Sequence, residues 1–180
     1  TSELLYVFAD LQTRVPTRIP DAFRAMLQRF RSGAPMTEVQ LGDWAALQAE
    51  ASALRRTVFV DEQGVPEHEE WDAADADCLH AVAHNGLGQA VATGRLLPAQ
   101  GGVAKLGRMA VLKPLRGTGV GAQVLQALER GSAARGDAAI ELSAQMSALG
   151  FYAKAGYVPE GEPYDEVGIA HIHMRKRHAR

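Results

Sequence analysis

A glycine-rich turn in the middle of the chain has the residue types and spacing of a phosphate-binding loop. It comprises Arg116, Gly117, Thr118, Gly119, Val120 and Gly121, between an apolar run over 106–112 and a helix-like run over about 120–134. Glycines let a backbone approach a ligand closely, and the first N–H groups of a helix have no acceptor within it. The pattern therefore predicts a site where backbone amides bind an anion, with a turn that binds nothing as the alternative.

Spacing separates three phosphate-binding patterns that this turn could represent. A P-loop needs Gly-Lys followed by Ser or Thr, and no lysine follows the glycines here. The dinucleotide pattern matches Gly117, Gly119 and Ala122 and, about twenty residues later, Glu141. However, residues 113–116 separate the turn from its strand, whereas in the dinucleotide fold the glycines follow the strand directly. The third pattern is that of a loop that binds coenzyme A.

Binding of coenzyme A is indicated by the resemblance of three segments of the chain to a known family. Residues 107–111, together with the turn 116–121, resemble the acyl-CoA motif of the GNAT N-acetyltransferases. Residues 151–157 resemble the late helix of that superfamily and the glycine turn after it. Residues 56–66, followed by Glu70, Asp72 and Asp75, are similar to its ElaA-like branch. The match covers roughly residues 37–176 of this sequence.

The resemblance implies a fold and a cofactor site. The fold is α+β, with a mixed, mostly antiparallel central sheet that splays open at the cofactor site and has helices on both faces. The co-substrate is acetyl-CoA, and no metal ion is expected. Amides of residues 117–121 would hold the pyrophosphate, and Arg116 would add positive charge at its edge. The backbone of Met109, Ala110 and Val111 would pair with the pantetheine amides like an added strand.

Acetyl transfer to an amine needs a neutral nucleophile and a thiolate that can leave. An alkylamine of pKa about 10.4 loses its proton at neutral pH at a cost of about 4–5 kcal/mol, so a base or a water relay would help. A thiol of pKa about 8.5 needs only assistance to leave. By resemblance, Tyr152 is placed to hydrogen-bond or protonate the departing sulfur, because it precedes the turn glycine Gly156 by one helical turn. A tyrosine that only packs its ring is the alternative.

The base is sought among carboxylates. Residues 61–77 include many acidic side chains and neither Lys nor Arg. Such a segment is most often a solvated loop, but it would also attract a cationic amine, and a carboxylate with a burial-raised pKa could accept a proton through water. Position in the ElaA-like motif selects Glu62, Glu70 and Asp72 as base or substrate-binding candidates. Glu141, expected at a strand end beside the cofactor site, is a rival.

The histidines and the single cysteine are weaker candidates for a catalytic or metal-binding role. His171 and His173 would share one strand face, but no third ligand has the spacing of a metal site. They are expected to be surface or pocket residues, with the alternative that one of them is the base. Cys78 cannot form an internal disulfide and is expected to be a buried small side chain rather than a catalytic thiol.

Two other functions stay open at this point. The signature of acyl-homoserine-lactone synthases, relatives of the acetyltransferase fold, is partly matched by Arg55, Phe59, Trp71, Asp72 and Asp75. That family usually takes its acyl group from a carrier protein, whereas the complete glycine turn favours free CoA. A sensor that binds acyl-CoA without turnover is the alternative from another class. The acceptor, a small-molecule or peptide amine, is not specified by the sequence.

Composition indicates one globular domain behind an extension. The chain has 180 residues, 47% of them hydrophobic, and a net charge of −2, which gives no support for a nucleic-acid partner. It has no apolar run of about eighteen residues and no basic leader, so we expect a cytoplasmic protein without a membrane partner. Residues 1–36 form the extension, with a short amphipathic helix from a cap at Asp21 to Gly33. Its apolar face could cover the core or a second subunit in a homodimer. Residues 37–180 form the domain.

Periodicity and turn residues predict the elements that must position the site. We expect strands over 36–41, 79–84, 89–97, 103–112, 138–142 and 169–174. Helices are expected after a cap at Asp43, over about 120–134, and over 145–155. The segment 85–88 is a hairpin turn, and an acidic loop precedes the first strand of that hairpin.

Overall fold

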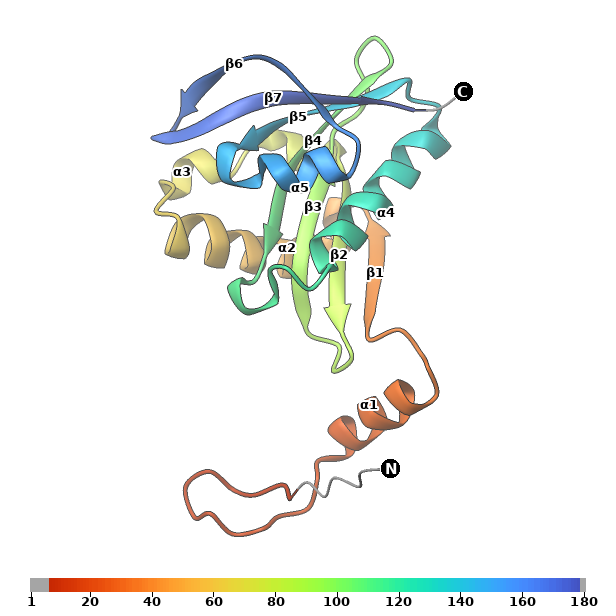
Figure 1. The fold of residues 1–180 in the computed structure, drawn as a ribbon, viewed down its shortest axis with the longest axis vertical. Helices are drawn as coiled ribbons and strands as arrows, with labels where there is room; N and C mark the ends of the chain where they lie inside the picture. Colours follow the sequence, from red (N-terminus) through yellow and green to blue (C-terminus); the bar gives the residue numbers. More distant parts are fainter. Residues whose placement is uncertain (1–6, 179–180) are drawn as a thin grey trace.

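A seven-stranded mixed sheet forms the body of the computed structural model, which describes residues 7–178 (Figure 1). The strand order is β1-β2-β3-β4-β5-β7-β6, and all neighbours are antiparallel except β4 and β5. The strands are β1 (Thr37–Gly42), β2 (Leu79–Asn85), β3 (Ala90–Leu96), β4 (Val103–Val111), β5 (Ala139–Gln145), β6 (Val158–Glu166) and β7 (Ile169–Arg177). The predicted fold class is confirmed.

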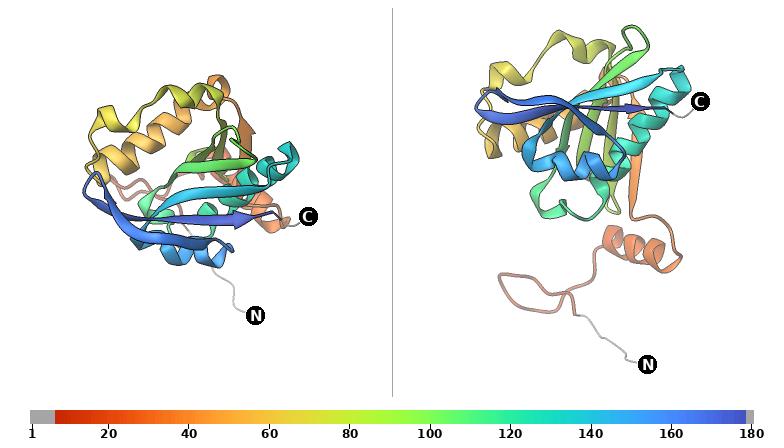
Figure 2. Two further views of the ribbon diagram at one scale, coloured as in Figure 1. Left: turned by 90° about the horizontal axis from the view of Figure 1, so that it is seen from above. Right: turned by 45° about the horizontal axis from the view of Figure 1, so that its top comes forward.

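Helices cover both faces of the sheet (Figure 2). One face has α2 (Trp44–Arg55) and the short α3 (Glu67–Glu70), and the other has α4 (Val120–Arg135) and α5 (Leu149–Lys154). The predicted cap of α2 is present, since Asp43 Oδ1 accepts the amide of Ala46 at 2.9 Å. Both faces of the sheet bury apolar side chains. On one face, Leu47 and Leu54 of α2 pack against Val82. On the other face, Leu125 and Leu128 of α4 lie in the core. This packing fixes the loops at the end of the sheet.

The sheet splays between β4 and β5. Their pairing is confined to Val103–Leu106 alongside Ala139–Leu142, and beyond Leu106 strand β4 pairs only with β3. At this point β4 has a bulge, because Gly94 of β3 faces two residues, Arg108 and Met109, and Arg108 has a φ of 52°. The bulge turns β4 away from β5 and leaves one edge of residues 107–111 without a neighbouring strand.

Three predictions about elements were wrong. Strand β6 was not predicted, because its prolines and glycine are untypical of a strand; it is tolerated as the sheet edge, paired only with β7. Strand β5 continues to Gln145, and α5 begins only at Leu149, because residues 143–145 pair with β7. The acidic segment 61–77 is not a simple loop: it contains the end of a π-helical turn over Arg56–Glu62, α3, and a 3-10 turn over Ala73–Asp77.

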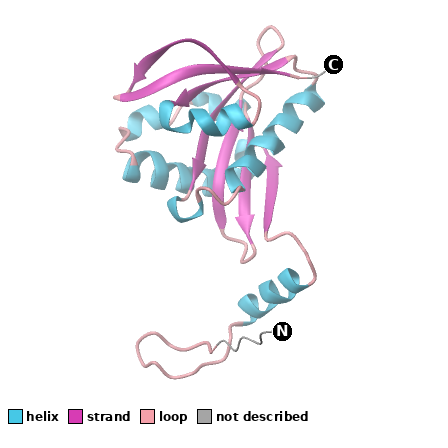
Figure 3. Ribbon diagram, in the orientation of Figure 1, coloured by secondary structure: helices cyan, strands magenta, loops and turns pink. Residues whose placement is uncertain are grey.

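The N-terminal extension carries α1 (Asp21–Arg31), which stands apart from the sheet (Figure 3). The helix was predicted, but its N-cap is Pro20, and Asp21 lies in the first turn, where it pairs with Arg18 at 2.9 Å. Not one residue of α1 is buried. Within residues 7–178 no helix has the length and apolar character needed to cross a membrane.

Candidate active site

The glycine turn forms a cradle of free amides at the start of α4. Gly117 and Gly119 have φ values of 81° and 93°, which glycine adopts without strain. In the described part of the chain, no acceptor faces the amides of Gly117, Gly119, Val120 or Gly121. Thr118 differs, because its amide and its hydroxyl both donate to the Leu115 carbonyl, at 3.3 and 2.7 Å. Converging free amides at a helix N-terminus suit an anion.

Space around the turn is compatible with a bound phosphate. A Cβ added at Gly117 or Gly119 would meet no other heavy atom within 4 Å, so the cradle is open. At Gly121 the added atom would lie 3.1 Å from Val111 Cγ2. This third glycine lets α4 begin directly against β4, which places the cradle beside the splayed edge of the sheet.

The splayed edge of β4 has backbone groups available for an extended ligand. Leu112 N–H donates to Val91 of β3 at 3.0 Å, and Ala110 lies opposite Thr93. Because alternate residues of a strand bond to alternate sides, the backbone groups of Met109 and Val111 face the gap, whereas those of Ala110 face β3. Of the three predicted residues, Ala110 thus contributes packing, and it is 1% exposed.

Arg116 and Glu62 are paired with each other. Nη1 and Nη2 of Arg116 reach Oε1 and Oε2 of Glu62 at 2.5 and 2.7 Å, and Nε donates to the Val111 carbonyl at 3.0 Å. This guanidinium lowers the pKa of the Glu62 carboxyl and has its own pKa raised in return. Glu62 is therefore a poor proton acceptor, and it ties the π-helical turn to the cradle.

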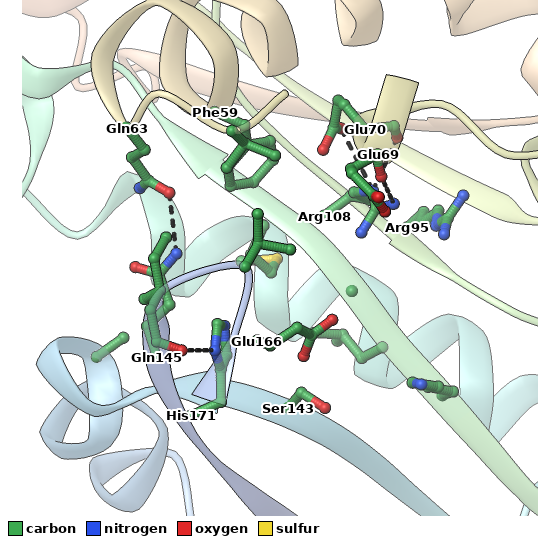
Figure 4. Close-up of a pocket in the computed structure, with 18 of the residues that line it drawn as sticks. Phe59, Gln63, Glu69, Glu70, Arg95, Arg108, Ser143, Gln145, Glu166 and His171 are labelled. Atoms are coloured by element: carbon green, nitrogen blue, oxygen red, sulfur yellow. Dashed lines mark hydrogen bonds and ion pairs between the residues drawn. The ribbon is translucent and has the colours of Figure 1, made fainter. Parts of the chain in front are cut away.

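A cleft of about 450 Å³ opens where β4 and β5 part (Figure 4). Its walls include Phe59, Gln63, Glu69, Glu70, Asp72, Arg108, Met109, Ser143, Gln145, Tyr152, Glu166 and His171. Gln145 Nε2 donates to Gln63 Oε1 at 2.9 Å, so β5 is linked to the π-helical turn across one end of the cleft. The cleft brings together Glu70, Asp72, Met109 and Tyr152 of the predicted residues.

Tyr152 lies on α5 at the wall of the cleft. It is 7% exposed, and its ring makes edge contacts with Phe151 and Tyr157, with centroids 4.9 and 5.9 Å away. Burial raises the pKa of the Tyr152 hydroxyl, which therefore stays protonated at neutral pH. Such a group can donate a hydrogen bond to a developing thiolate.

A network of paired charges, four of whose six members line the cleft, was not predicted from the sequence. It consists of Arg55, Arg95 and Arg108 with Glu70, Asp72 and Asp75. Buried Arg55 donates to Glu70 at 2.6 Å and to Asp75 at 2.8 Å, with its guanidinium over the rings of Trp44 and Trp71. For Glu70, Asp72 and Asp75 the prediction of a solvated acidic loop was wrong, because arginines from α2, β3 and β4 pair with them. The other acidic side chains of the segment are exposed, as predicted: Asp61, Glu62, Glu67, Glu69 and Asp77.

The network changes the base candidates. Two hydrogen bonds from Arg95, at 2.6 and 2.8 Å, lower the pKa of the Asp72 carboxyl to about 2, so Asp72 does not take up a proton at neutral pH. Burial raises the pKa of Glu70 despite its arginine partners, but Glu70 is only 3% exposed. Glu141 lies in the middle of β5, opposite Lys105, and does not line the cleft. Its predicted place at a strand end was wrong, because β5 runs on to Gln145.

Ser143, Gln145, Arg108 and His171 line the cleft and were missed or assigned no clear role. A signal for the first two exists, since apolar residues alternate through β5 as far as Ala144 and so place residues 143 and 145 on the other face. Arg108 has no such signal, because its place depends on the bulge.

Cys78 is buried and hydrogen-bonded. Cys78 Sγ donates to the Ala74 carbonyl at 3.0 Å, and burial raises its pKa to about 11, as expected for a packed side chain. Across residues 7–178 no group of three or more His, Cys, Asp or Glu side chains could hold a metal ion.

Comparison with known proteins defines the class. The family model described as "Acetyltransferase (GNAT) domain" matches residues 47–178, which is most of the chain. The chain therefore belongs to the GNAT acetyltransferase family and is an acyl-CoA N-acyltransferase. Its relatives include ElaA of Escherichia coli, 34% identical over 130 residues that cover 68% of this chain and 82% of ElaA. The ElaA crystal structure aligns with a TM-score of 0.71 and covers 79% of this chain and 100% of that one.

Two further relatives agree with this assignment. YjcF of Bacillus subtilis, named as an uncharacterized N-acetyltransferase, is 38% identical over 128 residues that cover 71% of this chain and 90% of YjcF. The crystal structure of an acyl-CoA N-acyltransferase from Pseudomonas aeruginosa aligns with a TM-score of 0.69 at 32% identity, covering 78% of this chain and 99% of that one.

A CoA-dependent acyl-homoserine-lactone synthase, BjaI, is a more distant structural neighbour. It aligns with a TM-score of 0.63 at 18% identity and covers 77% of this chain and 82% of that one. At this identity the likeness shows the fold alone. The residues that resemble the synthase signature are here mainly members of the buried charge network.

Proposed function

We propose that the protein transfers the acetyl group of acetyl-CoA directly to an amine, without an acetylated enzyme intermediate. The observation that carries this proposal is continuity along β4: Gly121 of the cradle lies against Val111 at one end of the open edge, and Met109 of the same edge lines the cleft with Tyr152. A pantetheine chain needs such a path from its diphosphate to its thioester. The same residues would be unexplained in a protein that only needed a strand-to-helix turn.

The cradle and the strand edge would bind the co-substrate through backbone. The amides of Gly117, Gly119, Val120 and Gly121 would donate to the diphosphate, at about 1.5–3 kcal/mol for each charge-assisted hydrogen bond. Met109 and Val111 would pair with the pantetheine amides. Arg116 would supply positive charge nearby, in competition with Glu62. Bound acetyl-CoA supplies the activated acyl group.

The cleft, which lies beyond the cradle and the edge of β4, would bind the acceptor amine. Glu69 and Glu166 line it, and within the described residues neither has an arginine partner for its carboxylate, so both favour a cationic group. The acceptor would be a small-molecule or peptide amine. Tyr152 would donate a hydrogen bond to the departing sulfur as the C–S bond breaks.

Two alternatives have specific consequences. A lactone synthase would form a lactone ring after acylation, and mass spectrometry of the product would reveal it. A sensor would bind acetyl-CoA without releasing CoA thiol in the presence of any amine. The free amides of the cradle are equally compatible with a sensor, so turnover separates the two.

Binding and turnover test the proposal in order. Thermal shifts with acetyl-CoA, CoA and NAD come first, because a ligand at about 100 times its dissociation constant adds about 2.7 kcal/mol of stability. Release of CoA thiol is then followed with ethylamine, spermidine and a peptide with a free amino terminus. Stabilisation by NAD but not by CoA, or binding without thiol release, would contradict the proposed activity.

A further inference from the structure

The transfer proposed above still lacks a group that takes the proton from the amine. The paired carboxylates are poor choices, since Glu62 and Asp72 are held ionised by arginines. Glu70 is buried, and its Oε1 lies 2.6 Å from Arg55 Nε and 3.3 Å from Arg108 Nε. A proton acceptor must have a free lone pair that opens on the cleft.

His171 has such a lone pair. It lies opposite Gln145 in the pairing of β5 and β7, at the end of the splay, and it lines the cleft (Figure 4). Its Nδ1 is 2.7 Å from the carbonyl oxygen of Ile169. Because a carbonyl only accepts hydrogen bonds, Nδ1 carries the hydrogen, and in the neutral ring the lone pair is therefore on Nε2.

Neighbouring residues hold the imidazole in place. The ring of Tyr164 stacks on it with centroids 6.1 Å apart and an interplanar angle of 27°. The Tyr164 hydroxyl donates to Ser143 Oγ at 2.6 Å, so β6 and β5 both restrain the stack. Two restraints act on the imidazole, one on Nδ1 and one on the ring face, and among residues 7–178 no hydrogen bond engages Nε2.

We infer that His171 is the general base of the transfer, an inference that rests on the proposed function. Nε2 takes a proton from the amine nitrogen as the N–C bond forms, and the electron pair of the C–S bond leaves with the sulfur. Tyr152 donates a hydrogen bond to that sulfur, which is protonated from solvent. The imidazolium returns its proton to solvent, so an acceptor that enters as an ammonium ion releases one proton overall.

The surroundings of His171 include other groups that titrate or carry charge. These are Tyr164 and Glu166 of β6, His173 of β7, Tyr152 of α5, and Glu69, Glu70 and Arg108 across the cleft. His173 provides a matched control, because it is on the same strand, packs on Tyr164 at 4.7 Å, and does not line the cleft.

The test compares His171→Gln with His173→Gln, using acetyl-CoA and ethylamine. Glutamine keeps a polar side chain at this position but has no group that acts as a base near neutral pH. In the wild type, kcat/KM should rise with pH through an inflection that depends on His171. H171Q should lose that inflection and about 10²–10³-fold in rate at neutral pH, with the dissociation constant of CoA unchanged. H173Q should keep the wild-type profile.

A cavity variant gives an independent readout. In His171→Ala, added imidazole should restore part of the lost rate, which a purely structural role would not allow. An H171Q profile with the wild-type inflection and rate would overturn the inference and leave the proposed transfer intact, since the wild type would still acetylate. A wild type that binds CoA but acetylates none of the amines would instead overturn the proposed function itself.

Discussion

Tyr152 brings a neutral hydroxyl to the wall of the cleft, and its role can be separated from its packing. Tyr152→Phe removes the hydroxyl and keeps the ring contacts with Phe151 and Tyr157. We expect kcat to fall about ten- to hundredfold, because a thiolate leaves unaided only slowly at neutral pH, with CoA affinity unchanged. Steady-state kinetics and calorimetry measure the two effects.

Tyr157→Phe is the control for this substitution. The Tyr157 hydroxyl faces Glu129, and Tyr157 does not line the cleft, so removing this hydroxyl should leave the rate unchanged. If Y152F and Y157F have the same kcat, the hydroxyl of Tyr152 plays no part in the chemistry.

A charge placed in the cradle tests whether its amides bind the diphosphate. Thr118 is exposed between Gly117 and Gly119, and both Thr118→Glu and Thr118→Gln lose its hydroxyl contact with Leu115. They differ only in charge. At about 4 Å a carboxylate repels a phosphate charge by about 1–4 kcal/mol, so T118E should bind CoA about tenfold or more weakly than T118Q. Equal dissociation constants by calorimetry would place the diphosphate elsewhere.

The bulge in β4 is the element that turns this sheet into a binding site. A Cβ at Gly94 would collide with Met109 Sδ and lie 3.0 Å from Leu128 Cδ1. Gly94→Ala should therefore reduce the free energy of unfolding by about 1–3 kcal/mol and displace Met109 from the edge that faces the gap. Urea unfolding measures the first effect. Gly107→Ala is the matched control for stability, since a Cβ there meets nothing within 4 Å.

Elements with a local signal were predictable from the sequence, and those that depend on pairing were not. Helix α2 was predicted from the cap at Asp43 and from the spacing of its inward residues Leu47, Ala51 and Leu54. The cradle and the start of α4 were predicted from the glycines. β6 has no apolar alternation of its own and is a strand only because β7 pairs with it. The charge network likewise joins residues from separate elements, so it could not be predicted from the spacing of residues along the chain.

The charge network links α2, α3, β3 and β4, and its contribution to stability depends on pH. Arg95 depresses the folded-state pKa of Asp72 from 3.8 to about 2. The resulting stability is complete above the unfolded pKa of about 3.9 and is lost as the pH falls towards 2. Glu70 acts in the opposite sense, because burial raises its pKa and stability is lost as it ionises.

Asp72→Asn should reveal this contribution in acid. We expect the variant to be less stable than the wild type at neutral pH, with a difference that narrows by about 1–2 kcal/mol between about pH 5 and pH 2.5, allowing for the partial exposure of Asp72. Urea unfolding at several pH values measures it. A difference independent of pH would mean that the pairing with Arg95 contributes no net stability.

The whole molecule consists of a packed sheet domain and an extension that barely touches it. Met26 lies against Gly86, and Arg29 pairs with Glu38, but Leu11 is 97% and Phe30 63% exposed. Covering apolar side chains that are exposed to this degree lowers the free energy of the protein in water. We propose that a second copy of the chain covers them in a homodimer.

Removal of residues 1–34 tests both parts of this description. The truncated chain should keep its affinity for CoA and its thermal stability to within about 1 kcal/mol, because the core and the cradle lie wholly in the sheet domain. By light scattering the full chain should be a dimer and the truncated chain a monomer. Phe30→Asp should have the same effect on assembly without shortening the chain, because Phe30 is exposed and is not packed within one copy of the chain. A full chain that is monomeric at about 100 μM would contradict the dimer, whereas a truncated chain that loses CoA binding would mean that the extension supports the site.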